Sequence, residues 1–318
     1  MRATESLWPM VDCTPACLSC RGALSTLERM TKVRRVSVVI PTRDRPLLLS
    51  EAYASLRRQT LQDFEVIISV NGKHATSLPE ARRIEESDDR VKVLHNPKFN
   101  LSEAWDAGFD EAEGEMVHFL SDDDLLEPGF LEAGCGAFAD RPELDLVGTD
   151  YVVITDSGET IPMPCMLTHR GGIDARAGSA PISAFVLNVS IFRRRLLQRM
   201  DTGHGPFDPS FRIHGDEDFF VRLSRFGAKA FHLCVPLVRY RVHPEQATQV
   251  KLATHFFEHI RVANSIRKLT LREATAETLW AVNHGSRFLG TRVKKRLGLN
   301  PSYDVFPIDL LRYPELRP

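Results

Sequence analysis

The sequence has no long apolar run and almost no net charge, and these absences exclude several classes of protein. No stretch approaches the roughly 18 consecutive apolar residues that a membrane-spanning helix requires. The start of the chain lacks the basic residues and apolar segment of a secretory signal, so we expect a cytoplasmic protein, with peripheral contact at a membrane left open. A formal net charge of -1 gives no strongly basic face for a phosphate backbone, so we expect no nucleic-acid partner.

Cysteine is also scarce, and half of it lies at one end of the chain. Three of the six cysteines, Cys13, Cys17 and Cys20, form a C-x3-C-x2-C pattern within a segment that shows no hydrophobic period. Radical-SAM enzymes hold an iron–sulfur cluster with this spacing, but the remaining sequence offers none of the cofactor-binding loops that such a barrel needs. We therefore interpret residues 1–32 as a disordered tail whose cysteines are either an accidental cluster or a weak metal-binding site.

Beyond this tail, short β-branched runs alternate with segments of helical period. This alternation predicts parallel βαβ units and an α/β fold, and the apolar fraction of 43% is ordinary for a globular domain. Pro41 is expected to end the first strand. The expected strands are residues 36–40, 64–70, 91–94 and 116–120, and the expected helices are residues 46–59 and 102–112.

Polar residues follow three of these strands. Ligands of parallel sheets gather beyond the carboxyl ends of the strands, so residues 42–45, Asn71 and the run Asp122-Asp123-Asp124 are expected at one rim. Three adjacent carboxylates repel one another, and a divalent cation, which prefers oxygen ligands, would neutralise them. The alternative is an acidic loop that caps the next helix, with Pro128 in its first turn.

The second half of the chain has a different pattern. Strand-like pieces at residues 146–154 and 230–240 flank loops rich in proline and glycine, and residues 254–296 have a helical character. A helix is expected over residues 216–226, where Asp218 and Arg222 are four apart and can pair. From the residues alone, this is a helix with acidic residues in its first turn, which suits the helix dipole.

Several motifs together resemble one known family. They are "VSVVIPTRDRPLLLSEAYASLRRQTLQDFEVIISVN" from residue 36, "NLSEAWDAGFDEAEGE", "GEMVHFLSDDDLLEPGFLE" and "YRVHP". In this order they are similar to the family-two glycosyltransferases, and the resemblance covers residues 34–245. It implies a GT-A fold, which is a Rossmann-like mixed sheet flanked by helices. The implied domain spans residues 33–248, with a nucleotide-sugar half (33–126), an acceptor half (127–248) and a helical C-terminal extension (249–318).

The resemblance assigns a donor site to the predicted rim. It implies a divalent cation, Mn²⁺ or Mg²⁺, and a UDP-sugar donor, with other bases open because Val70 stands where relatives have an aspartate that reads uracil. The implied nucleotide-sugar-binding residues are Pro41, Thr42, Arg43, Arg45, Asn71, Asp122 and Asp123. The implied metal ligands are Asp122, Asp123, Asp124 and His243, with the choice between Asp123 and Asp124 as main ligand left open.

The resemblance also assigns the catalytic carboxylates. The family's general base lies six residues before an arginine, which is Asp216 when counted from Arg222, and Asp218 then takes a supporting role. Gly215 departs from the glutamate usual before that base. A base here would remove the proton of the acceptor hydroxyl as it attacks the anomeric carbon.

The resulting hypothesis is a metal-dependent, inverting glycosyltransferase. It would transfer one sugar to a carbohydrate or lipid-linked acceptor in cell-envelope or polysaccharide biosynthesis. One alternative is a sugar nucleotidyltransferase, although "PTRDRP" lacks the glycine-rich loop of that class. The other is a catalytically degenerate module that binds sugar or nucleotide, which the departures at Val70, Ser121 and Gly215 would favour.

Overall fold

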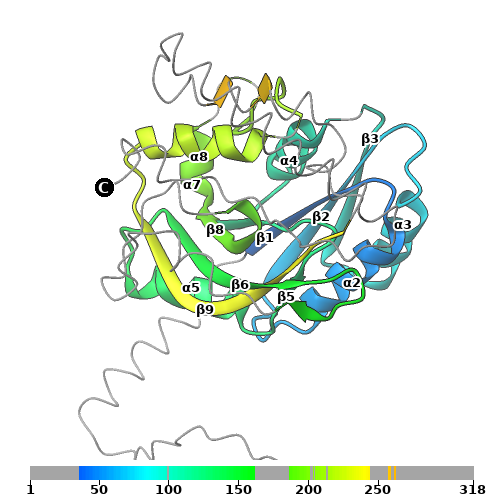
Figure 1. Cartoon of the computed structure of the whole chain (residues 1–318), viewed down its shortest axis with the longest axis horizontal. Coiled ribbons are helices and arrows are strands. Elements are labelled where there is room, and N and C mark those ends of the chain that lie inside the picture. The colour runs from blue at the N-terminus through cyan, green and yellow to red at the C-terminus, as the bar shows by residue number, and fades with distance from the viewer. Residues whose placement is uncertain are drawn as a thin grey trace, which may run out of the picture. The chain divides into compact units, whose positions relative to one another are not determined.

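Strands and helices alternate along the chain in the computed structural model, as Figure 1 shows. The structure describes residues 36–98, 100–161, 186–200, 203, 205–212, 214–243, 257–258 and 261–262. The predicted tail and nearly all of the predicted C-terminal extension lie outside the described residues, so both stay predictions. The three N-terminal cysteines also lie outside them.

Nine strands form one mixed sheet within the described residues. The order is β3-β2-β1-β4-β8-β6-β9-β5, and β7 pairs with β6 beside this path. β1 to β4 are mutually parallel, β8 is antiparallel to both β4 and β6, and β6 and β9 are parallel to each other. The strands are β1 (Val36–Thr42), β2 (Phe64–Asn71), β3 (Val91–Asn96), β4 (Met116–Phe119), β5 (Leu125–Leu126), β6 (Leu146–Ile154), β7 (Thr160–Ile161), β8 (Ser190–Arg193) and β9 (Ala230–Arg241).

The strand order defines where a ligand can bind. The chain runs outward from β1 through β2 to β3, and then returns to place β4 on the other side of β1. This reversal lies between β1 and β4, and doubly wound sheets bind their ligands beyond the carboxyl ends of the strands at such a reversal. The segments after β1 and β4 are two of the three rim segments that the sequence analysis singled out.

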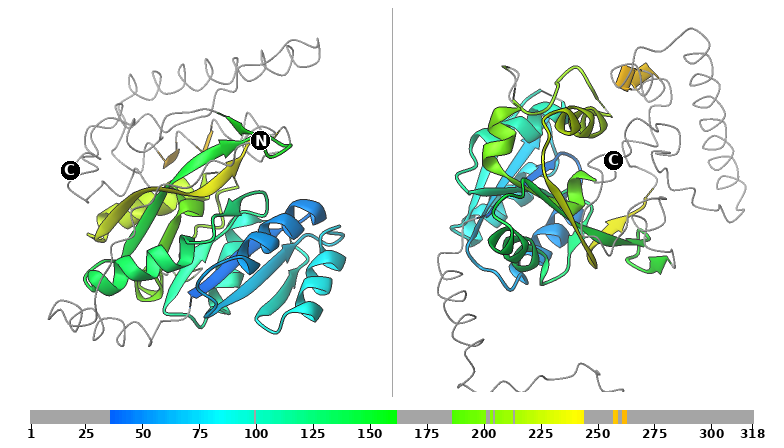
Figure 2. Two further views of the ribbon diagram at one scale, coloured as in Figure 1. Left: turned by 90° about the horizontal axis from the view of Figure 1, so that it is seen from below. Right: turned by 90° about the vertical axis from the view of Figure 1, so that its left-hand side faces the viewer.

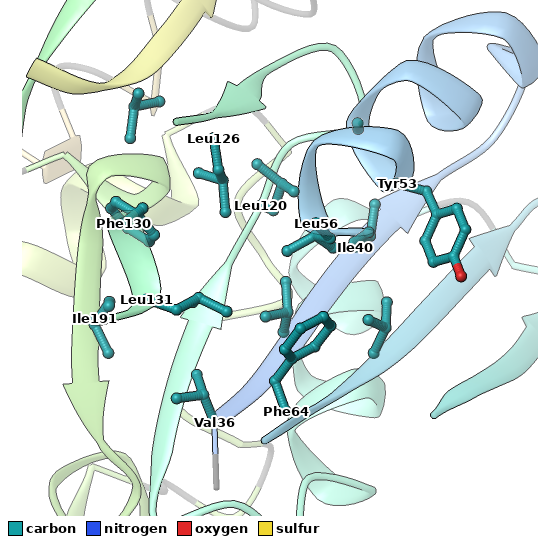
Figure 3. Packing of buried hydrophobic residues seen from close by; sticks show 14 of the residues in the cluster. Val36, Ile40, Tyr53, Leu56, Phe64, Leu120, Leu126, Phe130, Leu131 and Ile191 are labelled. Carbon is teal, nitrogen blue, oxygen red and sulfur yellow. The ribbon is translucent and has the colours of Figure 1, made fainter. Parts of the chain in front are cut away.

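Helices cover both faces of the sheet, as the two views of Figure 2 show. Buried side chains of α2, α3 and α5 share one apolar cluster with the sheet, part of which is drawn in Figure 3. Those of α4, α7 and α8 share the other cluster. The helices are α2 (Pro46–Arg57), α3 (Leu78–Ser87), α4 (Leu101–Asp110), α5 (Phe130–Asp140), α7 (Arg194–Arg199) and α8 (Gly215–Arg225), with a 3-10 turn η2 (Leu187–Val189).

Local sequence signals explain where helices α2 and α4 begin. Pro46 occupies the first position of α2, where its missing N–H costs nothing. The side chain of Asn100 accepts a hydrogen bond of 3.3 Å from the N–H of Glu103 and so caps α4. The apolar stripes of both helices then pack on the sheet, and burying each large apolar side chain contributes about 1.5–3 kcal/mol.

The expectation that Pro41 ends the first strand is wrong. β1 continues to Thr42, and Pro41 pairs in register with Ser69 of β2. Val39 faces β4, because its carbonyl accepts from the N–H of Leu120, and Pro41 faces the same side two residues later. The pairing of β1 with β4 ends at Val39 and Phe119, so the missing N–H of Pro41 lies beyond the paired part of these two strands.

Candidate active site

The acidic run follows β4 directly and is tied to residues after β1. Thr42 Oγ1 donates a hydrogen bond of 2.7 Å to Asp122 Oδ2. The Arg45 guanidinium lies 3.2 Å from Asp122 Oδ1 and 2.7 Å from Asp123 Oδ2, so it bridges the two carboxylates. Asp122, Asp123 and Asp124 are all buried, which means that protein groups rather than bulk water must compensate their charges.

The charge on this loop is only partly compensated. Burial raises the pKa of Asp122 to about 6, and the negative charge of Asp123 adds to the rise. The Arg45 guanidinium and the Thr42 hydroxyl act in the opposite direction, but they do not cancel it. A cation bound at this loop would therefore be stabilised by carboxylates that lack a full complement of positive charge.

Asp124 has a different environment from its two neighbours. It is fully buried, and its Oδ1 accepts a 2.9 Å hydrogen bond from the backbone N–H of Arg241. Asn188 Nδ2 donates to its other oxygen. Burial raises the pKa of Asp124 well above its ordinary value, and the charge of Asp123 reinforces the shift. Both oxygens of Asp124 thus bind protein donors that fix the loop to β9 and η2.

Asp123 contacts His243, the histidine that the resemblance implies as a further metal ligand. His243 follows β9 and is buried, and its Nε2 lies 2.9 Å from Asp123 Oδ2. A carboxylate oxygen and an imidazole nitrogen suit Mn²⁺ as ligands. Within the described residues, no group of three or more His, Cys, Asp or Glu side chains is gathered as a complete metal site. The pair therefore fits a cation that takes its remaining ligands from elsewhere.

Arg241 is an internal support for this loop. Its side chain is buried, its Nε donates a 2.9 Å hydrogen bond to the carbonyl of Asp123, and its Nη1 donates one of 2.7 Å to the carbonyl of Asp156. Its Nη2 lies 2.6 Å from a carboxylate oxygen of Glu51 on α2. One guanidinium therefore joins α2, the acidic loop and the turn after β6.

The ends of β1 and β2 form the neighbouring part of the rim. Asn71 Nδ2 donates a 3.2 Å hydrogen bond to the carbonyl of Thr42. The Oδ1 of Asn71 and the Oγ of Ser69 are buried without a hydrogen-bond partner in the described structure. Gly72 follows with a φ of +107°, and a Cβ there would lie 3.2 Å from Arg43 Nε, so Arg43 lies against this turn.

The second carboxylate region is the first turn of α8. Asp218 Oδ2 lies 2.7 Å from Arg222 Nε, the pairing that the spacing predicted. Asp216 is half-buried, and its Oδ1 accepts a 2.9 Å hydrogen bond from the N–H of Glu217. Burial raises the pKa of Asp216 to about 6, the charge of Glu217 adds to this, and His214 opposes it.

An aromatic stack connects the two carboxylate regions. Phe119 ends β4, three residues before Asp122, and its ring lies 5.1 Å from that of Phe207 in an edge-to-face contact. Phe207 stacks at 4.7 Å on Phe219, three residues after Asp216. Buried aromatic contacts of this kind are rigid and well packed. They hold the start of α8 in a set position relative to the end of β4.

Tyr240 of β9 lies within the electrostatic influence of both regions. Burial raises the pKa of its phenol, and the carboxylates of Asp124, Asp123 and Asp216 raise it further. The phenol thus remains protonated and available as a hydrogen-bond donor at neutral pH.

The structure joins most of the predicted residues into one connected network. Hydrogen bonds and ion pairs link Thr42, Arg45, Asp122, Asp123 and His243, and Asn71 binds the carbonyl of Thr42. Sequence reasoning missed the roles of Asn188 and Glu51. Neither carries a local motif, because Asn188 binds Asp124 and Glu51 pairs with Arg241, each from a distant segment of the chain.

Comparison with known proteins identifies the family. The profile described as glycosyl transferase family 2 matches residues 37–222, more than half of the chain, so the chain belongs to this family. It is 25% identical over 232 residues to the uncharacterized glycosyltransferase EpsJ of Bacillus subtilis (strain 168), covering 71% of this chain and 66% of that protein. It is 33% identical over 99 residues to the GalNAc(5)-diNAcBac-PP-undecaprenol beta-1,3-glucosyltransferase of Campylobacter jejuni, covering 30% of this chain and 32% of that one. The chain thus spans less than two thirds of these relatives' own lengths.

Known structures support the predicted fold. A mannosyltransferase PcManGT from Pyrobaculum calidifontis, in complex with GDP-Man and Mn²⁺, superposes with a TM-score of 0.57 at 18% identity, covering 86% of this chain and 81% of that one. S. aureus TarS 1-349 in complex with UDP-GlcNAc superposes with a TM-score of 0.56 at 17% identity, covering 89% and 79%. The fold is the GT-A glycosyltransferase fold. No helix among the described residues has the length and apolar character to cross a membrane.

Proposed function

We propose that this protein is an inverting glycosyltransferase that uses a nucleoside-diphosphate sugar and a divalent cation. The observation that carries the proposal is the contact between Asp123 and His243, 120 residues apart, at the carboxyl end of the sheet. A carboxylate and an imidazole suit a divalent cation as ligands. They lie beside the rim where we place the nucleotide, so diphosphate oxygens would supply the other ligands of the cation. Such a cation would offset the charge on the departing diphosphate.

Among the three aspartates, we assign the metal to Asp123. Both oxygens of Asp124 already accept from Arg241 and Asn188, so this carboxylate would have to give up structural bonds to bind an ion. Asp122 accepts from Thr42 and Arg45, which supports a role in holding the loop against the nucleotide. Arg45 bridges Asp122 and Asp123 and would partly neutralise them before the donor binds.

For the donor base we favour uracil. Asn71 Oδ1 is a buried acceptor without a hydrogen-bond partner, and leaving such an atom unpaired costs about 1–3 kcal/mol. An imide N–H of the base would satisfy it. Guanine presents a comparable N–H, and the two structural neighbours bind UDP-GlcNAc and GDP-Man, so a GDP-sugar is the alternative.

For the acceptor side we propose Asp216 as general base. Its pKa of about 6 suits a carboxylate that must accept a proton near neutral pH. Asp218 is ion-paired with Arg222, which supports a positioning role. A carbohydrate or lipid-linked acceptor is consistent with the undecaprenol-linked glycan in the name of the Campylobacter jejuni relative.

The direct test is a turnover assay with a panel of nucleotide sugars, run with manganese, with magnesium and with a chelator. We expect release of nucleoside diphosphate with a UDP-sugar that depends on the metal and is lost in Asp123→Asn. Nucleotide binding without turnover of any donor would instead support a degenerate binding module. Formation of a nucleotide sugar from a sugar 1-phosphate and a nucleoside triphosphate would support the nucleotidyltransferase alternative.

A further inference from the structure

A short segment, of which residues 257–258 and 261–262 are described, contacts the chain immediately before α8 through Glu258, Arg261 and Val262. Glu258 is buried, and each of its carboxylate oxygens accepts one backbone hydrogen bond. Oε1 accepts from the N–H of Arg212 at 2.8 Å, and Oε2 accepts from the N–H of His214 at 3.0 Å. One carboxylate, 44 residues further along the chain, therefore satisfies two N–H groups of a single turn.

Other residues of the same segment strengthen this contact. The guanidinium of Arg261 lies over the Phe211 ring at 4.0 Å and 3.3 Å from an oxygen of Asp208. Val262 packs with Phe211 and with Val221 of α8 in a small buried cluster. The turn before α8 is thus held by packing as well as by the Glu258 carboxylate.

His214 transmits the position of this turn to the candidate base. Its carbonyl accepts a 3.0 Å hydrogen bond from the N–H of Asp218, the first such bond of α8. Its Nδ1 lies 2.6 Å from an oxygen of Glu217. Fixing the backbone at His214 therefore fixes where α8 begins and the direction in which the side chains of its first turn point.

Electrostatic interactions also link His214 with Asp216 and Glu258. Burial lowers the pKa of His214, but the carboxylates of Glu217, Asp216 and Glu258 outweigh it and leave that pKa raised. The positive charge on His214 in turn stabilises the ionised form of Asp216. Glu217 on α8 therefore acts on both His214 and Asp216, and Glu258 from the later segment acts on His214.

We propose that Glu258 is a positioning residue for Asp216, through its two hydrogen bonds to the turn that ends at His214. This inference rests on the proposed function, because it assumes that Asp216 accepts the acceptor's proton. The two carboxylate oxygens of Glu258 accept from backbone N–H groups rather than from Asp216. Glu258 acts by holding the turn, and a displacement of about 1 Å in a catalytic group costs on the order of 100-fold in rate.

The test compares full-length Glu258→Gln with the wild type and with Glu86→Gln. Glutamine matches the volume of glutamate but presents an N–H donor to one of the two backbone N–H groups. One of the two hydrogen bonds is therefore lost with little change in packing. Glu86 is exposed on α3, far along the chain from α8, and serves as the matched control. The measurements are single-turnover transfer rates from pH 5 to 8, UDP affinity and thermal unfolding.

We expect Glu258→Gln to lower the transfer rate by roughly 10- to 100-fold with UDP affinity within about twofold of wild type. The acid limb of its rate profile should also move to higher pH, because His214 loses a carboxylate neighbour and then stabilises ionised Asp216 less. Glu86→Gln should match the wild type in all three measurements. An unchanged rate, or a uniform loss at every pH that parallels reduced UDP affinity and unfolding temperature, would overturn the proposal.

The same data separate this inference from the proposed function. If wild type transfers sugar and Asp216→Asn does not, the function stands, and the Glu258→Gln profile decides the inference alone. If Asp216→Asn transfers at the wild-type rate, the base assignment fails, and with it the premise of the inference.

Discussion

The two carboxylate regions of the site are held in opposite ways. Asp123 and Asp124 are bound by Arg45 after β1, by Asn188 of η2, by the backbone N–H of Arg241 in β9 and by His243 after it, and all of these partners except Arg45 are buried. Asp216 is half-buried on the first turn of a helix, and its Oδ1 accepts a hydrogen bond from the N–H of Glu217 within that turn. The difference matches the roles we propose for the two regions. The acidic loop would hold a cation and gains from partners that are already in place. Asp216 would act as the base and must keep an oxygen that can accept a proton.

Removing the base should give the largest effect. Asp216→Asn is expected to lower the transfer rate by roughly 100-fold or more, since positioned proton transfer contributes about 10²- to 10⁴-fold. UDP affinity should not change. In the wild type, the rate should rise with pH through about 6, because Asp216 must lose its proton before it can act. Single-turnover kinetics across that pH range measure both effects.

Asp218→Asn is the control for this experiment. Its carboxylate is paired with Arg222, so we expect a modest change in rate with the acid limb in its wild-type position. A slow Asp218→Asn beside a full-speed Asp216→Asn would assign the base to Asp218 and reverse our interpretation of α8.

The acidic loop should divide into one metal-binding and one structural aspartate. Asp123→Asn is expected to weaken manganese-dependent UDP binding by at least roughly 10- to 100-fold, the range seen even for indirect metal partners. Asp124→Asn should act mainly on stability, because it replaces a buried acceptor of two protein donors. Calorimetric titration with and without a chelator, together with urea unfolding, separates the two. Equal loss of metal-dependent affinity with unchanged stability in Asp124→Asn would contradict this division.

The rigid support of the acidic loop can be tested at Arg241. Arg241→Ala leaves the buried carbonyl of Asp123 and the partly buried carbonyl of Asp156 without this donor, so we expect a loss of about 1–3 kcal/mol in the free energy of unfolding. Arg239→Ala is the matched control on the same strand. Arg239 pairs with Glu127 at a partly exposed position, and such surface pairs contribute about 0–1 kcal/mol. Similar losses in both variants would show that Arg241 has no special role.

The smallest expected effect concerns the packing of α8 on α4. A Cβ at Gly215 would lie 2.7 Å from Ser102 Oγ and 3.6 Å from the Trp105 ring. Gly215→Ala should therefore destabilise the fold by roughly 1 kcal/mol, the lower end of overpacking costs. Adding Ser102→Ala should recover part of that loss. A double-mutant cycle by thermal unfolding measures the coupling, and strictly additive effects would contradict the contact.

The regular part of the fold was predictable from local patterns. The strands of the first half and α2, α4 and α8 lie within a few residues of their expected positions, because each carries a clear apolar period. α3, α7 and β8 were not predicted. α3 buries only Ala81 and Ile84, which gives little periodic signal, and β8 is a four-residue strand in the middle of the sheet. Their structure depends on neighbours that local sequence does not reveal.

The sequence by itself determined the α/β alternation, the rim at which polar residues gather, the acidic run and the Asp218–Arg222 pair. Each of these depends on residues close together in the chain. Only the tertiary structure decided that Asp124 is enclosed by Asn188 and Arg241 while Asp123 meets His243, and that Glu258 holds the turn before α8. These contacts join residues from 44 to 120 positions apart, and burial decides which carboxylate oxygens keep a protein partner.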